Sequence, residues 1–168
     1  MHPGQHRDQP GLERQQPQCR QQQGQKQRRG DRAAPQPATE STVPLTFSKI
    51  QGRPAARIAI DEGTDLYATG EVFGALRRND TKIVCWNTDS YGYGASNLSL
   101  YQSHPWVLAV RADGSSFGIL ADTTYRCLID LHDGILFAAE GPEFPVIIIE
   151  GDTPQQVLTR LADLVGTM

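Results

Sequence analysis

Residues 106–139 read WVLAVRADGSSFGILADTTYRCLIDLHDGILFAA, and this stretch decides the fold class. Apolar and β-branched runs over 106–111, 116–121, 124–131 and 135–139 are separated by turn residues. Two of the separators contain Asp-Gly, which between β-forming runs is the strongest short-range signal of a β-hairpin. The stretch therefore predicts antiparallel strands joined by hairpins, with a bend at 121–124.

The same pattern of short apolar runs and turn residues continues on both sides of this stretch. Short apolar runs that end at turn residues predict further strands at 57–60, 66–69, 82–86 and 145–150. No helical pattern separates them, and several short strands at this spacing are typical of a sandwich rather than a parallel sheet. We therefore expect an all-β fold, an antiparallel β-sandwich, over residues 42–152.

The period of the apolar residues changes after residue 152. Thr153 is a suitable N-cap, Pro154 suits the first helical position, and Gln156 stands where a capping box has Glu or Gln. Apolar residues then recur at helical spacing until Gly166, a typical helix stop. Residues 153–168 are therefore predicted to form a C-terminal amphipathic helix.

Residues 1–41 differ from the rest of the chain in composition. They contain eleven glutamines and almost no large apolar side chains, so burial cannot offset the cost of ordering the backbone, and we expect a disordered leader. Its basic residues could form an arm that binds RNA or a protein partner. A solvated leader is favoured, because no aromatic residue is interleaved with the charges.

The rest of the chain is acidic: residues 41–168 contain nine Lys or Arg against fifteen Asp or Glu. This balance argues against a nucleic-acid surface, which needs a clustered basic patch. No run of apolar residues suits a signal peptide or a membrane span, so a soluble, cytoplasmic protein without membrane contact is expected. The three cysteines and four histidines lack metal-ligand spacing, and we expect no metal and no cofactor.

The strongest candidate for a binding site is the segment WNTDSYGYG at 86–94. Asp89 and Asn87 could hydrogen-bond to sugar hydroxyls, while Trp86 and Tyr91 could stack on the apolar face of a pyranose ring. Alternatively, Asn87 and Asp89 are common turn formers whose side chains bond to their own backbone. From the residues alone, the turn interpretation is favoured.

Two other residues could take part in chemistry. Glu71 follows a predicted strand end and could bind a ligand, but an ion pair with Arg77, Arg78 or Arg126 is the favoured interpretation. His104 titrates near neutral pH and could act as a general base. A histidine beside a proline and a tryptophan more often bonds to a backbone carbonyl, so no catalytic residue is assigned.

Five ordered motifs resemble the N-terminal region of the α-glucosidases of glycoside hydrolase family 31. They are LYATGE (66–71), WNTDSYGYG (86–94), LYQSHPWVLAVR (100–111), FGILADTTYRC (117–127) and AEGPEFPVIIIEGDTPQQVL (139–158). The resemblance implies a β-sandwich of galactose-mutarotase type, packed on a catalytic (β/α)₈ barrel. It also implies that Asp89 contacts substrate. The family usually has Gly at the position of Ala68, which argues against an unusual backbone conformation there.

The resemblance implies the N-terminal domain of an α-glucosidase-like glycoside hydrolase, which acts on α-linked glucosides and supplies a loop of the substrate pocket. The catalytic aspartates of the family lie on the barrel, which this chain lacks, so we expect a fragment that is inactive alone. Residues 153–168 would lead to the missing barrel. A stand-alone carbohydrate-binding module is the alternative. A mutarotase-like epimerase using His104 or Glu71 is less favoured.

Overall fold

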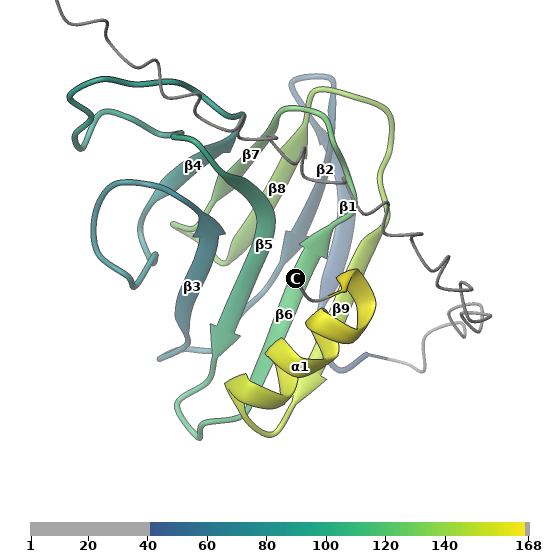
Figure 1. Ribbon diagram of the computed structural model, residues 1–168. Helices are drawn as coiled ribbons and strands as arrows, with labels where there is room; N and C mark the ends of the chain where they lie inside the picture. Colours follow the sequence, from purple (N-terminus) through teal and green to yellow (C-terminus); the bar gives the residue numbers. More distant parts are fainter. Residues whose placement is uncertain (1–40, 167–168) are drawn as a thin grey trace, which may run out of the picture. The chain divides into compact units, whose positions relative to one another are not determined.

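The computed structural model describes residues 41–166, so the leader prediction lies almost entirely outside the described residues. The described part forms nine strands followed by one helix (Figure 1). The elements are β1 (Leu45–Ile50), β2 (Arg53–Ile58), β3 (Asp65–Gly70), β4 (Lys82–Cys85), β5 (Ser103–Val110), β6 (Ser116–Ala121), β7 (Cys127–Asp130), β8 (Ile135–Ala139), β9 (Val146–Gly151) and α1 (Pro154–Val165).

The strands form two antiparallel sheets, which confirms the predicted β-sandwich. The first has the order β1-β2-β8-β7-β4 and the second the order β3-β5-β6-β9. The Asp-Gly turns join β5 to β6 and β7 to β8, both antiparallel neighbours, as predicted. Residues 122–126 carry the chain from the second sheet to the first.

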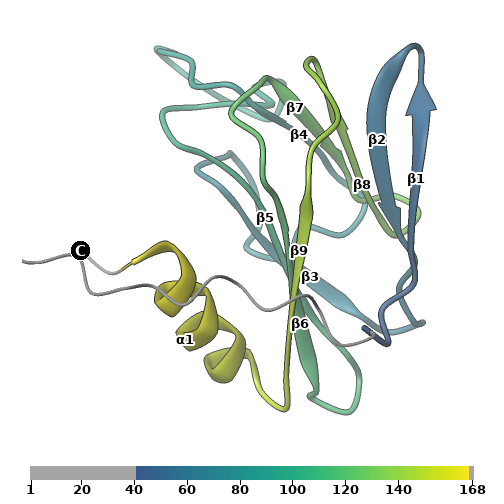
Figure 2. The ribbon, with the colours of Figure 1, turned by 90° about the vertical axis from the view of Figure 1, so that its right-hand side faces the viewer.

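The hydrophobic core lies between the two sheets. Phe137 and Ile129 of the first sheet and Phe117, Ile119 and Val107 of the second belong to one cluster of buried side chains. Because side chains alternate between the faces of a strand, every second residue of the inner strands joins this cluster. Figure 2 shows the two sheets on either side of this layer.

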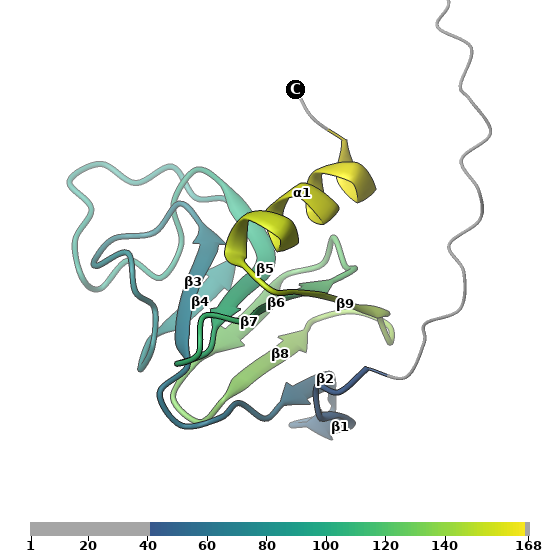
Figure 3. The ribbon, with the colours of Figure 1, turned by 90° about the horizontal axis from the view of Figure 1, so that it is seen from below.

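The outer face of the second sheet is covered by α1 (Figure 3). Val157 of the helix packs there with Trp106, Leu108 and Ile149. The helix begins as predicted: Gln156 N donates to Thr153 Oγ1 at 3.3 Å, and Gln156 Oε1 accepts from Asp152 N at 3.0 Å. Within residues 41–166 no helix is long and apolar enough to cross a membrane.

The predicted strands were incomplete at the N-terminal side. Strand β1 was missed, and the strand predicted at 57–60 runs from Arg53 to Ile58 instead. Most side chains of β1 are exposed because it is an edge strand, so it has no buried face to produce a clear pattern. Pro54 is tolerated in β2 because only residues 55–58 pair with β8. The strand predicted at 124–131 is shorter, at Cys127–Asp130.

The backbone at Ala68 contradicts the sequence-based expectation. Ala68 and Thr69 both have φ of +78°, and the pairing of β3 with β5 shifts register between Ala68 and Gly70. A bulge at this point forces the left-handed region although the residue is not glycine, which costs free energy because of its Cβ.

We therefore expect Ala68→Gly to raise the free energy of unfolding by about 0.5 to 1 kcal/mol, since glycine adopts positive φ without steric cost. Chemical denaturation followed by circular dichroism would measure the change. Ala109→Gly is the matched control: Ala109 is fully buried on β5 at ordinary φ, so the same change should destabilise the chain. A loss of stability in Ala68→Gly would contradict the inference that the backbone at Ala68 is strained.

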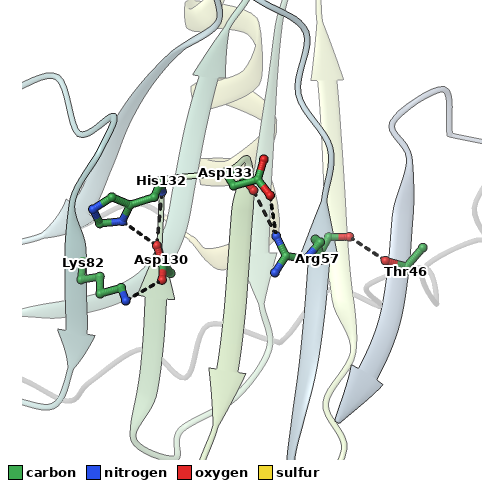
Figure 4. Close-up of polar contacts among 6 residues, drawn as sticks. All are labelled: Thr46, Arg57, Lys82, Asp130, His132 and Asp133. Atoms are coloured by element: carbon green, nitrogen blue, oxygen red, sulfur yellow. Dashed lines mark hydrogen bonds and ion pairs between the residues drawn. The ribbon is translucent and has the colours of Figure 1, made fainter. Parts of the chain in front are cut away.

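The outer face of the first sheet carries ion pairs between strands (Figure 4). Asp130 pairs with Lys82 at 3.0 Å and with His132 Nδ1 at 2.7 Å, while Arg57 pairs with Asp133 at 3.5 Å. Partial burial raises the pKa of Asp130, but the hydrogen bonds from His132 and Lys82 outweigh it and hold the pKa below its usual value. These contacts join β4 to β7, and they join β7 and β2 to the β7–β8 turn, so they stabilise the first sheet.

Candidate functional site

The candidate site lies in the long loop of residues 86–102, which leaves the end of β4 and returns to β5 (Figure 1). Its base is held by backbone bonds: Val84 N donates to Leu98 O at 2.8 Å and Thr88 N to Leu100 O at 2.7 Å. Ser99 Oγ also donates to the carbonyl of Trp86. The two arms of the loop therefore run side by side and fix the backbone at Trp86.

The tip of the loop is open to solvent but is braced from two sides. The hydroxyl group of Tyr101 donates a hydrogen bond to Ser90 O at 2.9 Å. The rings of Tyr93 and Phe73 meet edge to face, with centroids 6.4 Å apart, and this contact joins the loop to the segment between β3 and β4. Tyr91 lies between these braces and Asp89 directly before them, both with exposed side chains, Tyr91 at 97%.

Trp86 forms a wall of two neighbouring hollows. The first, the Trp86–Tyr125 hollow, has a volume of about 560 Å³. Its lining combines two aromatic rings with hydroxyl and amide groups, from Cys85, Trp86, Asn87, Ser103, Pro105, Thr123, Thr124 and Tyr125. Trp86 and Tyr125 are each about half exposed, at 54% and 51%, so both rings present surface to a ligand.

The second, the Trp86–Arg126 hollow, has a volume of about 310 Å³. It is lined mainly by the arms of the loop itself, together with Val84 and Arg126. Both hollows offer aromatic or aliphatic surface beside hydrogen-bonding groups, the combination that binds sugars. Their lining contains no carboxylate among the described residues, so neither hollow holds a carboxyl group that could serve as general acid or nucleophile.

Two of the four predicted binding residues line these hollows. Trp86 lines both and Asn87 lines the first, whereas Asp89 and Tyr91 lie beyond them on the exposed tip. The alternative that Asn87 and Asp89 act as turn formers gains no support, since neither side chain has a hydrogen-bond partner within residues 41–166.

Sequence reasoning missed the contribution of residues 123–126. Tyr125 faces the first hollow from the crossing between the sheets, and its ring lies against Gly141, where a Cβ would come within 3.0 Å of three ring atoms. A glycine opposite an aromatic residue is a signal for close packing. The partners are sixteen residues apart, however, and no local pattern connects them.

The prediction that Glu71 forms an ion pair was wrong. Arg77 pairs with Asp65, Arg126 lies 3.9 Å from Glu140, and Arg78 donates to the carbonyls of the 72–73 segment. Burial without a carboxylate partner lowers the pKa of Arg78. Glu71 instead uses its backbone N–H, which donates to Gln102 O at 2.9 Å.

His104 lies on β5 with its side chain exposed, outside both hollows. Cys85, in contrast, is buried at the end of β4 and lines the first hollow beside Trp86. Within residues 41–166 the two hollows therefore combine aromatic rings with hydroxyl, amide and guanidinium groups, and no carboxylate or histidine lines them.

Comparison with known proteins identifies the fold and the family together. The family model of the glycosyl hydrolase 31 N-terminal galactose mutarotase-like domain matches residues 13–130. The chain belongs to glycoside hydrolase family 31. The resemblance to this family and the expected galactose-mutarotase-like sandwich are thereby confirmed.

This family 31 domain is similar to much longer proteins. It is 36% identical to α-glucosidase 2 of Bacillus thermoamyloliquefaciens over 70% of the chain and 15% of that protein. It is 26% identical to the α-xylosidase of Emericella nidulans, over 82% of the chain and 17% of that protein. The chain thus spans about one sixth of the length of these relatives.

A solved structure gives the same result in three dimensions. The family 31 α-glucosidase from Bacteroides thetaiotaomicron superposes with a TM-score of 0.65 at 44% identity, covering 72% of this chain and 21% of that one. The family 31 domain therefore corresponds to an N-terminal domain of such glycosidases.

Proposed function

We propose that this family 31 domain supplies one wall of the substrate pocket of an α-glucosidase-like glycoside hydrolase that acts on α-linked glucosides. In this proposal residues 42–152 are the sandwich, and residues 153–168 lead towards a catalytic barrel. The observation that carries it is the loop at 86–94. Its base is fixed by hydrogen bonds and carries the half-exposed ring of Trp86, while its tip presents Asp89 and Tyr91 to solvent.

Each candidate residue has a distinct task in the proposed pocket. The Asp89 carboxylate accepts hydrogen bonds from sugar hydroxyls, which are stronger than bonds between neutral groups. Asn87 can donate and accept at the same ring. Trp86 offers its exposed face to the apolar side of a pyranose, and the exposed ring of Tyr91 offers a second stacking surface at the tip.

Bond cleavage requires groups from elsewhere. A retaining glycosidase needs two carboxyl groups about 5 to 5.5 Å apart, flanking the anomeric carbon. Since the two hollows at Trp86 are lined without carboxylates in the described residues, the acid and the nucleophile are assigned to the barrel that the family resemblance implies. We expect the purified 168-residue chain to leave p-nitrophenyl α-glucoside unhydrolysed, and turnover would contradict the proposal.

The role of Asp89 can be tested in a chimera. The family 31 domain would replace the corresponding region of the Bacteroides thetaiotaomicron α-glucosidase, to which it is 44% identical. We expect Asp89→Ala in an active chimera to lower kcat/KM roughly 10- to 100-fold, because a hydrogen bond to a charged group contributes about 1.5 to 3 kcal/mol. Steady-state hydrolysis of p-nitrophenyl α-glucoside would measure the effect.

Asp133→Ala is the matched control for this substitution. Asp133 is also an exposed aspartate in a turn, but it belongs to the β7–β8 hairpin and pairs with Arg57. Its removal should leave kcat/KM unchanged. An Asp89→Ala chimera as active as the parent would refute a role of Asp89 in substrate binding.

A stand-alone carbohydrate-binding module is the second candidate, and the Trp86–Tyr125 hollow favours it. Two exposed rings beside hydroxyl and amide groups could bind a sugar without a barrel. Binding of maltose or isomaltose to the isolated chain at millimolar concentration, lost in Trp86→Ala, would support a module. Absence of binding would favour the first candidate, in which the domain forms only one wall of a pocket that a catalytic barrel completes.

The proposal also includes a cytoplasmic location for the chain. Cys85 and Cys127 are free thiols in the described structure. The reductants of the cytosol keep such thiols reduced, whereas secreted proteins more often carry disulfides.

A further inference from the structure

Cys85 and Cys127 occupy directly opposite positions on neighbouring strands. In the antiparallel pairing of β4 with β7, Cys85 is the register partner of Cys127. Both side chains belong to the same cluster of buried residues between the sheets, so they point to the same face. The two thiols are therefore cross-strand neighbours, although 42 positions separate them in the sequence.

This position comes close to the geometric requirement for a disulfide. Opposite residues of an antiparallel pair have Cα atoms about 4.5 to 5.5 Å apart, inside the range of about 4.4 to 6.8 Å found for disulfides. Their Cβ atoms lie about 4.5 to 5.5 Å apart, slightly beyond the range of about 3.5 to 4.5 Å of bonded cysteines. The strands need to approach only slightly, and the resulting bond should be readily reduced.

The two thiols differ in how a reagent reaches them. Cys85 lines the Trp86–Tyr125 hollow, which is open to solvent and has a volume of about 560 Å³. Cys127 is fully buried beneath it. A reagent in the hollow would meet Cys85 first, and Cys127 would then attack from the neighbouring strand.

We propose that Cys85 and Cys127 form a thiol–disulfide modification site that is oxidised by small-molecule disulfides of the glutathione class. The Cys85 thiolate attacks one sulfur of oxidised glutathione, forms a mixed disulfide and displaces the first glutathione thiolate. The Cys127 thiolate attacks Cys85 Sγ and displaces the second. The protein gives up two protons and two electrons, and one oxidised glutathione becomes two molecules of reduced glutathione.

Burial also determines how fast this reaction runs. It raises the pKa of Cys85 to about 12, assisted by the nearby Cys127, and it raises the pKa of Cys127 to about 11. Only the thiolate attacks, so the reaction is slow at neutral pH. The rate should increase about tenfold per pH unit well above pH 9, where an exposed cysteine with a pKa near 8.5 would already have levelled off.

The test uses the full chain with Cys19→Ser, which leaves the two thiols as its only cysteines. The folded protein is incubated with oxidised glutathione at pH 9, free thiols are alkylated, and peptides are analysed by mass spectrometry. We expect a linked peptide pair containing Cys85 and Cys127, a mass loss of two hydrogen atoms, and reversal by dithiothreitol. Folded protein that keeps both thiols free, or carries glutathione on each separately, would overturn the proposal.

The same chain in urea is a control that needs no further substitution. Unfolding separates the strands, so each thiol should take glutathione independently and the linked pair should become rare. Equal yields of the linked pair in folded and unfolded protein would contradict a site formed by the fold. Cys127→Ala should stop at a glutathione adduct on Cys85. This site does not depend on the proposed function, and its test reads no glycosidase activity.

Discussion

Gly118→Ala is expected to lower the free energy of unfolding by about 3 kcal/mol, at the upper end of the usual cost of overpacking. A Cβ at Gly118 would lie closer than 3.0 Å to three carbon atoms of the Trp106 ring. Trp106 is buried beneath α1, so its indole has no open space in which to move. Urea denaturation followed by circular dichroism would measure the loss.

Two further variants separate this clash from the general effect of replacing glycine. Gly94→Ala is the matched control, because Gly94 has ordinary φ and no atom within 4 Å of an added Cβ, and it should be nearly neutral. Trp106→Ala is costly by itself, but it removes the ring that the new methyl group meets. Gly118→Ala should therefore cost much less in the Trp106→Ala background, and full additivity would contradict the clash.

The contact of Trp106 with Gly118 illustrates what the sequence predicts and what it leaves open. The hairpin from β5 to β6 follows from the local Asp-Gly turn, and the structure confirms it. The placement of the indole depends on register, which pairs Leu108 with Gly118 and sets Trp106 diagonally across from it. Register and the cover provided by α1 are tertiary properties, so local patterns predict the strands but not this contact.

The candidate site likewise contains residues that the sequence predicted and residues that it did not. Trp86 and Asn87 were recognisable because aromatic and amide residues gather in one segment beside glycines. Tyr125 and the partnership of Cys85 with Cys127 were not, since the pairing of β4 with β7 brings together residues from distant segments. Glu71 was misjudged for a related reason: Arg77 and Arg78 are near it in sequence, but these two and Arg126 all have other partners in the fold.

Phe137→Ala is expected to lower the free energy of unfolding by about 3 to 5 kcal/mol, as is usual for deletion of a buried phenyl ring. Phe137 lies on β8, the central strand of the first sheet, and it is fully buried. Its register partners are Ala56 on one side and Ile129 on the other. Alanine at position 137 would leave a cavity that the small side chain of Ala56 cannot fill.

Phe47→Ala provides the matched control, because it removes the same ring from the same sheet. Phe47 lies on the edge strand β1 and is 63% exposed, so its truncation should cost less than about 1 kcal/mol. A similar loss in both variants would mean that the edge of the first sheet contributes as much as its centre. A much larger loss in Phe137→Ala would show that the layer of side chains between the sheets supplies most of the stability. Cys85 belongs to this layer and also lines the hollow beside the candidate loop, so the loop is anchored to the same core.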